Sequence, residues 1–198
     1  MIINVGIIGA TGHTGEELIN LLLGHPEVRI AKLYNTSSQP QIISDVFPKF
    51  KNKIDLVCKK PNLKEIADKC DLIFLALPHT VSMDFTPKLL KINKKVIDLS
   101  ADYRIKNTLI YELFYQVKHK DKVNLKEAVY GLPEIWRAKI KNAKLVANPG
   151  CYSTCAILGL APLAALNLIV PDSIVIDAKS GISGAGKRLV KELLFSEI

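Results

Sequence analysis

Short, continuous apolar runs recur along the chain, with helix-like segments between them. Such runs are typical of strands buried in a parallel sheet. They cover residues 3–8, 28–34, 72–77, 95–99 and 145–147. Apolar side chains at helical spacing occupy residues 16–23, 63–69, 81–92 and 154–166. The alternation predicts an α/β fold, a doubly wound (Rossmann) parallel sheet followed by the start of an α+β catalytic domain.

Several segments have a weaker pattern. Residues 35–61 predict short strands and loops, and residues 103–143 predict a mixture of elements. Residues 173–178 are rich in β-formers and lead into a second glycine loop at residues 179–187. Within the last predicted long helix, Pro162 predicts a kink or an early stop.

The domain boundary is expected near the end of the last buried strand. This gives a cofactor-binding domain at residues 1–148 and the beginning of a catalytic and dimerisation domain at residues 149–198. No internal repeat, low-complexity tract or obvious linker interrupts the chain.

Three glycines lie in the turn after the first predicted strand, in the sequence Gly9-Ala10-Thr11-Gly12-His13-Thr14-Gly15. Glycine lets the backbone turn tightly and approach a pyrophosphate, whose charge the N-terminus of the next helix stabilises. A glycine trio alone is weak evidence because turns use glycine anyway, but its place between a buried strand and a helix indicates a dinucleotide-binding unit. The residues predicted to bind cofactor here are Gly9, Thr11, Gly12, His13, Thr14 and Gly15.

The segment after the second predicted strand indicates which nicotinamide cofactor binds. An NAD site usually places Asp or Glu there to hold the ribose 2′-hydroxyl. This chain instead continues Tyr34-Asn35-Thr36-Ser37-Ser38-Gln39, with no acid before Asp45. The absence of charge repulsion and the hydroxyls of Ser37 and Ser38 favour the 2′-phosphate of NADP, although a plain polar turn would have a similar composition.

The chain has four histidines. His79 and the preceding Pro78 end a buried strand and are predicted to line the cofactor cleft, because such sheets bind ligands at the carboxyl ends of their strands. His25 and His119 are expected at solvated positions. None of the four has a sequence context that marks it as the acid/base partner of a catalytic cysteine.

Cys151 has the context of a nucleophile. It directly follows Asn148-Pro149-Gly150 at the expected start of a helix, where the partial positive charge of the helix N-terminus favours thiolate over thiol. Cys155, one helical turn further on, is the second candidate and is expected to pack inward. The cysteine spacing fits neither a disulfide framework nor a metal site, and Cys58 and Cys70 are expected to be buried structural residues.

Composition narrows the range of functions. The net charge is +8 and the pI about 9.3, but the lysines are scattered without interleaved aromatic residues, which favours a solvated surface over a nucleic-acid interface. Some of this charge can attract phosphorylated ligands. No window has the length of a membrane span and the first residues lack the features of a signal peptide, so a cytoplasmic protein without membrane partners is expected.

These motifs, taken together, resemble the N-acetyl-gamma-glutamyl-phosphate reductases of the aspartate-semialdehyde dehydrogenase superfamily. The matching stretches run in the family order across the chain, at residues 9–15, 71–79, 96–104, 128–134, 147–154 and 177–187. The Asn-Pro-Gly-Cys-Tyr and Lys-Ser-Gly-Ile-Ser-Gly-Ala-Gly stretches are the most specific of them.

The resemblance implies an enzyme of arginine biosynthesis that uses NADPH to reduce N-acetylglutamyl 5-phosphate to a semialdehyde through a thioester on Cys151. It further implies that Ser180, Gly181, Ser183 and Gly184 border the cofactor, and that the complete enzyme is a homo-oligomer. Family members continue beyond the last residue here and carry an acid/base histidine in that later part, so we expect this chain to hold only the beginning of the catalytic domain.

Two alternatives stay open at this point. The first is an enzyme of the same superfamily that reduces another acyl phosphate, such as aspartyl phosphate or a lysine-pathway analogue, because the residues here do not distinguish the acyl group. The second is a cofactor-binding remnant without catalytic activity, or a subunit that another polypeptide completes.

Overall fold

The computed structural model describes residues 2–36, 39–181 and 184. The chain divides into two compact units, Met1–Gly150 and Cys151–Ile198, and each is described by itself. Predictions for Ser37, Ser38 and Ser183 lie outside the described residues.

The first unit is built on an eight-stranded sheet with the order β3-β4-β2-β1-β5-β6-β8-β7. Its strands are β1 Ile3–Ile8, β2 Val28–Tyr34, β3 Gln41–Ile42, β4 Val57–Lys59, β5 Leu72–Leu75, β6 Lys95–Asp98, β7 Val129–Tyr130 and β8 Leu145–Ala147. All neighbouring pairs are parallel except β3 with β4. The chain passes from β1 outward to β2 and then returns to β5 on the other side of β1, so the strand order reverses between β1 and β5.

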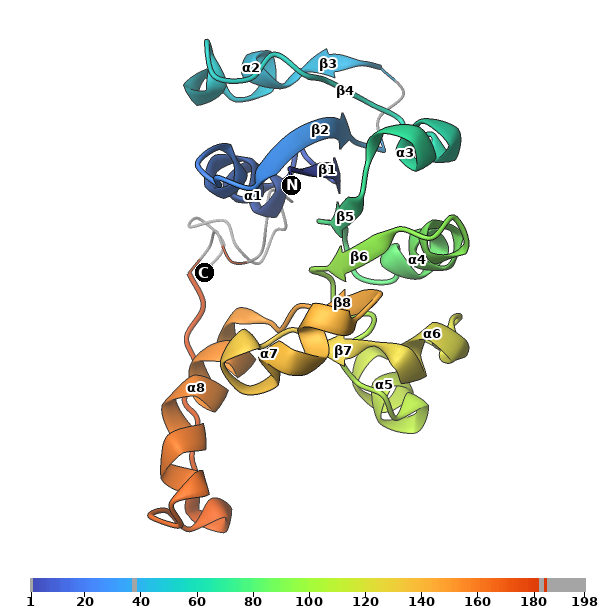
Figure 1. Cartoon of the computed structure of the whole chain (residues 1–198). Helices are drawn as coiled ribbons and strands as arrows, with labels where there is room; N and C mark the ends of the chain where they lie inside the picture. Colours follow the sequence, from blue (N-terminus) through green and yellow to red (C-terminus); the bar gives the residue numbers. More distant parts are fainter. Residues whose placement is uncertain (1, 37–38, 182–183, 185–198) are drawn as a thin grey trace, which may run out of the picture. The chain divides into compact units, whose positions relative to one another are not determined.

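Helices cover both faces of this sheet. They are α1 His13–Leu23, α2 Ile43–Val46, α3 Leu63–Lys69, α4 Ser82–Lys91, α5 Thr108–Tyr115, α6 Lys122–Glu127 and α7 Pro133–Asn142, with a short 3-10 turn, η1, at Pro48–Phe50. Figure 1 shows α1 on one face and α3 and α4 on the other. The predicted doubly wound α/β sheet is confirmed, including the irregular segment that holds β3, α2 and β4.

The two faces have separate hydrophobic cores. Val5 and Ile7 of β1 pack on the α1 face together with Ile19, whereas Ile8 packs on the opposite face together with Met83 of α4. All of these side chains are buried, and burial of each stabilises the fold by about 1.5–3 kcal/mol. Successive side chains of a strand point to opposite faces of the sheet, and helices cover both faces. The strand sequences are therefore apolar throughout.

The second unit begins with helix α8, Cys151–Ala165, followed by a 3-10 turn, η2, at Pro171–Ser173. The helix starts at Cys151, as the context of this residue predicted, and continues through Pro162, so of the expected kink or early stop the early stop is wrong. Residues 173–178 are all described and none lies in a strand, so the β-rich expectation there is also wrong. Strand propensity alone does not form a strand where no neighbouring strand pairs with it.

A row of backbone hydrogen bonds continues past the strand ends at the carboxyl edge of the sheet. It comprises Gly9 N–H to Tyr34 O (2.9 Å), Ala76 N–H to Ile8 O (2.8 Å), Leu99 N–H to Leu75 O (2.9 Å) and Asn148 N–H to Asp98 O (2.8 Å). The first residues of the loops that follow the four adjacent strands β1, β5, β6 and β8 are therefore each bonded to the end of a neighbouring strand. This is the edge on which doubly wound sheets bind their ligands.

Gly9 has a conformation that only glycine adopts without strain. Its φ is +93°, and a Cβ at this position would lie 2.1 Å from the carbonyl oxygen of Ala76. Gly24, at the end of α1, has a φ of −92°, and a Cβ there would make only an ordinary contact, with the Leu21 carbonyl oxygen at 3.9 Å. Gly24 is therefore a suitable control position for a substitution at Gly9.

Gly9→Ala is expected to lower the free energy of unfolding by about 3 kcal/mol, because it adds both backbone strain and a clash with backbone. Gly24→Ala is expected to change it by less than about 1 kcal/mol. Urea denaturation followed by circular dichroism checks both values. Equal effects at the two positions would show that the close approach of Gly9 to β5 is unimportant.

Candidate functional site

The glycine loop leaves an open cradle at the N-terminus of α1. Gly12 is the N-cap residue of this helix and has no side chain to cap the first-turn N–H groups. Among the described residues, a Cβ on Gly12 would have a single neighbour within 4 Å, the Gly9 oxygen at 3.6 Å, whereas one on Gly15 would lie 2.3 Å from that same oxygen. Gly15 therefore permits close packing within the loop, and Gly12 leaves room for a ligand. Backbone donors beside an empty space fit a pyrophosphate.

The other predicted loop residues surround this cradle. Thr11 lies in the loop itself, half-buried, and His13 and Thr14 are exposed in the first turn of α1. The Nδ1 atom of His13 lies 3.9 Å from a carboxylate oxygen of Glu16. The structure thus brings all six predicted loop residues together at the carboxyl edge of the sheet.

Asn35 is an unsatisfied polar residue directly after β2. The residue is 4% exposed, and neither its side-chain nitrogen nor its side-chain oxygen has a hydrogen-bond partner in the described structure. Its backbone N–H is bonded to Lys59 O at 3.0 Å, which fixes its place at the end of the strand. A buried amide without partners costs about 1–3 kcal/mol, so this position suits a polar ligand group that supplies the missing bonds. No motif in the sequence singles out Asn35.

His79 lies beyond the end of β5, where it contacts a buried acid. Its Nδ1 atom is 2.8 Å from Oδ1 of Asp102, which is fully buried, while the imidazole remains 31% exposed. Asp102 Oδ1 also accepts a hydrogen bond from the Thr80 N–H at 2.8 Å, and Oδ2 accepts one from Met83 N–H at 3.3 Å. Pro78, also predicted to line the cleft, is exposed on the same turn.

Two tyrosines of α5 enclose this histidine. The Tyr111 hydroxyl lies 3.3 Å from Asp102 Oδ1 and 3.4 Å from His79 Nε2, and the Tyr115 ring centroid is 4.3 Å from that of the imidazole. Burial and the neighbouring carboxylate raise the pKa of Tyr111, so its hydroxyl stays protonated and donates to Asp102. This cluster was not predicted, because its members come from segments well separated in the sequence.

His119 is buried, not solvated as its neighbouring lysines suggested. Its Nε2 atom lies 2.8 Å from the carbonyl oxygen of Asp102, and its Nδ1 accepts the N–H of Asp121 at 3.1 Å. A carbonyl can only accept, so Nε2 must carry the proton. The Tyr103 hydroxyl donates to Asp121 at 2.7 Å. His119 therefore supports the backbone that carries Asp102, and the adjacent lysines carry the solvated charge instead.

Arg104 joins the ends of two strands. Its Nη2 donates to Leu99 O at 2.8 Å and its Nε donates to Asn148 O at 2.7 Å. The guanidinium thereby fixes the segment after β6 to the segment after β8, which is the stretch that leads to Cys151. The rigid fork of arginine suits this double contact, which lysine cannot reproduce.

In the second unit, Cys151 is the first residue of α8 and is exposed. Cys155 is also exposed, so its expected inward packing is wrong, because no residue of α8 is buried in the described part of this unit. Of the second glycine loop, Ser180 donates its hydroxyl to Gly181 O at 3.3 Å and the Gly184 N–H donates to the same oxygen at 3.0 Å. Their predicted contact with a cofactor stays a prediction.

The other two cysteines are buried in the first unit, as expected. Burial raises the pKa of Cys58 and of Cys70 to about 11, which keeps both thiols protonated near neutral pH. Cys151 and Cys155 are therefore the accessible thiols among the described residues.

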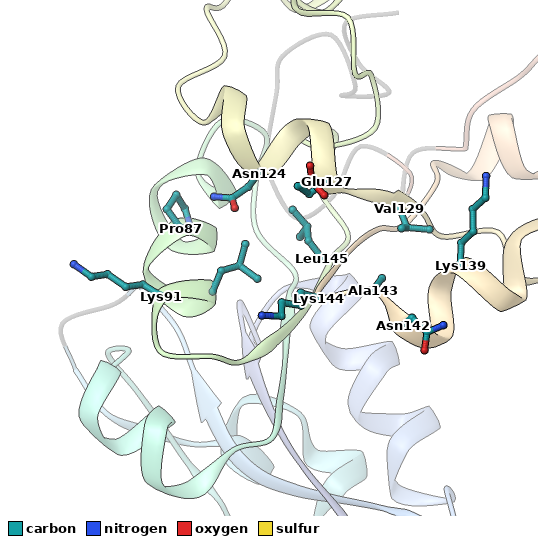
Figure 2. A pocket seen from close by; sticks show the side chains of 11 residues that line it. Pro87, Lys91, Asn124, Glu127, Val129, Lys139, Asn142, Ala143, Lys144 and Leu145 are labelled. Carbon is teal, nitrogen blue, oxygen red and sulfur yellow. The ribbon is translucent and has the colours of Figure 1, made fainter.

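A cavity of about 730 Å³ lies at the opposite, amino edge of the sheet, beside the first residues of β7 and β8. Lys144 and Leu145 of this edge line it, together with residues of α4, α6 and α7. In Figure 2 the ammonium groups of Lys91 and Lys139 extend away from the hollow. Size alone therefore does not make it the functional site, because the polar and strained groups converge at the carboxyl edge.

The described residues were also searched for a membrane-spanning helix and for a metal site. No helix among them is long and apolar enough to cross a membrane. Nor does any group of three or more His, Cys, Asp or Glu side chains in the described ranges have the geometry to hold a metal ion.

Comparison with protein families gives a direct match. The model of the semialdehyde dehydrogenase NAD-binding domain matches residues 4–143, and that of the semialdehyde dehydrogenase dimerisation domain matches residues 151–198. The chain belongs to the semialdehyde dehydrogenase family. The superfamily suggested by the sequence motifs is therefore confirmed.

Curated relatives place the chain near one enzyme of this family. It is 48% identical over 195 residues to the N-acetyl-gamma-glutamyl-phosphate reductase of Desulforudis audaxviator, and 46% identical over 196 residues to that of Geobacter metallireducens. These alignments cover 98% and 99% of this chain but 56% of each relative. The chain thus spans a little more than half the length of the relatives it matches.

Solved structures show the same fold at low sequence identity. Aspartate semialdehyde dehydrogenase from Candida albicans, solved with NADP, aligns with a TM-score of 0.58 and 20% identity, covering 84% of this chain and 47% of that one. Aspartate semialdehyde dehydrogenase II from Vibrio cholerae aligns with a TM-score of 0.59 and 19% identity, covering 94% of this chain and 49% of that one.

Asp98, the last residue of β6, provides a test of electrostatics at this edge. The carboxylate is fully buried and accepts hydrogen bonds from the Ser100 N–H and hydroxyl at 3.1 and 2.8 Å. Burial nevertheless raises its pKa above the ordinary value, to which the nearby Asp102 contributes. The folded state therefore holds this proton more tightly than the unfolded chain does. The stability that this contributes is present below the unfolded pKa of about 4 and is lost as pH rises through the folded value.

Asp98→Asn removes this titration while keeping groups that can pair with Ser100. The free energy of unfolding of the variant, relative to the unmodified protein, is expected to increase as pH rises from about 4 to about 7. Urea titrations at a series of pH values measure the difference. A difference that stays constant across this range would contradict the role assigned to Asp98.

Proposed function

We propose that this chain carries the cofactor domain and the nucleophile of an NADPH-dependent N-acetyl-gamma-glutamyl-phosphate reductase. The reaction reduces N-acetylglutamyl 5-phosphate to N-acetylglutamate 5-semialdehyde and phosphate, in the cytoplasm, as a step of arginine biosynthesis. One observation carries the proposal: an exposed cysteine opens α8 in a chain that aligns over 98% of its length with reductases of this name.

The residues of the first unit fit a dinucleotide. Gly12 and the first turn of α1 offer the pyrophosphate an open cradle, and Asn35 offers an unpaired amide at the place of the adenosine ribose. Asn35 replaces the acid of an NAD site, so nothing there repels a 2′-phosphate. This supports NADP, the cofactor in the Candida albicans structure. Ser37, Ser38, Ser180, Gly181, Ser183 and Gly184 complete the proposed set.

Cys151 would provide the covalent step. Its thiolate attacks the acyl carbon, the bond from that carbon to the phosphate oxygen breaks, and phosphate leaves with the electron pair and takes a proton from solvent. When bound, NADPH supplies the hydride that reduces the resulting thioester. The tetrahedral oxyanion then collapses to the aldehyde, and the sulfur departs as thiolate with the electron pair of the C–S bond.

The match of residues 151–198 to a dimerisation domain supports a homo-oligomer for the complete protein. Helix α8 is consistent with this, because its apolar side chains, such as Leu158 and Leu163, are exposed in the described part of its unit. Apolar surfaces of this kind mark association interfaces.

Acylation tests the nucleophile directly. Full chain incubated with N-acetylglutamyl 5-phosphate is expected to gain one acyl group on Cys151, detected by mass spectrometry and removed by hydroxylamine. Cys151→Ala should abolish the adduct and lower NADPH-dependent turnover about a thousandfold or more. Cys155→Ala is the matched control and should retain both. An adduct on Cys155, or none in a chain that binds NADPH, would contradict the proposed mechanism.

Aspartyl phosphate, tried in the same assay, tests the acyl group. Faster turnover of aspartyl phosphate than of the N-acetylglutamyl substrate would assign the chain to a different member of the family.

Asn35→Asp tests the cofactor. A carboxylate at this position would repel a 2′-phosphate, so the dissociation constant of NADPH is expected to rise about tenfold or more while that of NADH stays the same or falls. Fluorescence titration of the reduced cofactors measures both constants. An equal change for the two cofactors would mean that Asn35 does not face the 2′-position.

A further inference from the structure

We propose that His79, oriented by Asp102, holds the sugar of the nicotinamide half of the cofactor through its Nε2 atom. This inference rests on the proposed function and adds a specific contact to it. His79 would be a cofactor-binding residue, and Asp102 a positioning residue that acts through it.

The topology places His79 on the correct side of the loop. The pyrophosphate cradle follows β1, and Asn35, at the place of the adenosine ribose, follows β2. A dinucleotide lies across the point where the strand order reverses, so its other half extends over the ends of β5 and β6. His79 follows β5, and Ala76, the first residue after this strand, lies so close to Gly9 that a Cβ on Gly9 would be 2.1 Å from the Ala76 carbonyl oxygen.

The contacts of the imidazole ring then indicate which of its nitrogen atoms is available to a ligand. Nδ1 lies 2.8 Å from the Asp102 carboxylate, in an ion-pair contact outside hydrogen-bond geometry, and a carboxylate oxygen this close favours the tautomer that carries the proton on Nδ1. Tyr111 has one hydroxyl proton and directs it to Asp102. Nε2, 3.4 Å from that hydroxyl, is left with a lone pair and no strong donor. The ribose hydroxyls of the nicotinamide half are donors that can make such a hydrogen bond.

Three further features hold the imidazole in this orientation. Asp102 is fully buried and is anchored by the backbone N–H groups of Thr80 and Met83. Thr80 has a φ of +74°, a strained conformation for a β-branched residue, of the kind that persists at functional sites. Tyr115 covers one side of the imidazole ring. The remaining 31% of the side chain is accessible, so the ring is held rigidly with one region open.

Two substitutions separate the two nitrogens of the ring. In His79→Asn the amide can replace Nδ1 but cannot reach the place of Nε2, whereas in His79→Gln it can reach that place. His79→Asn is expected to raise the dissociation constant of NADPH about tenfold, and His79→Gln to restore most of that affinity. His25→Asn, an exposed histidine after α1, is the control and should change nothing.

A second probe separates a sugar contact from a structural effect. Adenosine 2′,5′-bisphosphate contains the adenosine half of NADP without the nicotinamide ribose, so both His79 variants are expected to bind it within about twofold of the unmodified full chain. Asp102→Asn should weaken NADPH in the same selective way.

Each outcome has one meaning. Equal losses for both probes, equal NADPH binding by His79→Asn and the unmodified chain, or no recovery in His79→Gln would overturn the inference. If the unmodified chain binds adenosine 2′,5′-bisphosphate, the proposed NADP function survives these failures. If it binds neither probe, the NADP function itself is wrong.

Discussion

The backbone hydrogen bonds that extend the sheet beyond its carboxyl edge are the constraint on which the rest of the structure depends. Each loop that leaves β1, β5, β6 or β8 starts with a backbone N–H bonded to a neighbouring strand. The loops consequently start from fixed points, although their sequences and lengths differ. Side chains from residues 9 to 148 can then converge on one face without any covalent cross-link. Backbone groups provide this order because their geometry is independent of the side chains.

Close packing of the glycine loop adds a second constraint. Gly9 and Gly15 bring the loop, β5 and α1 so near to one another that no side chain fits between them. The N-terminus of α1 therefore points toward the carboxyl edge of the sheet, and the packing of the glycine loop fixes its position. A site assembled in this way is preorganised, and binding loses little energy to rearrangement.

The fold was largely predictable from the sequence because its signals are local. Continuous apolar runs, glycine positions and helical spacing identified the doubly wound sheet, the first loop and the position of Cys151 at a helix start. The Asp102 cluster was not predictable, because His79, Tyr111 and His119 meet only in three dimensions. His119 was wrongly expected at a solvated position for the same reason. The lysines beside it in the sequence do not determine whether His119 itself is buried in the folded chain. Residues 173–178 were wrongly expected to be β-rich structure. A strand needs a neighbouring strand to pair with, and high strand propensity alone does not supply one.

The ends of the sheet have a consequence for how the protein stays dispersed. β3 at one end and β7 at the other are each two residues long, so neither presents a long row of unpaired backbone groups to another molecule. Growth of the sheet from chain to chain, as in amyloid, is thereby hindered at both ends. Apolar helical surfaces such as Leu109 and Phe114 of α5 remain available, so self-association should preserve the native strands and produce amorphous clusters instead of fibrils.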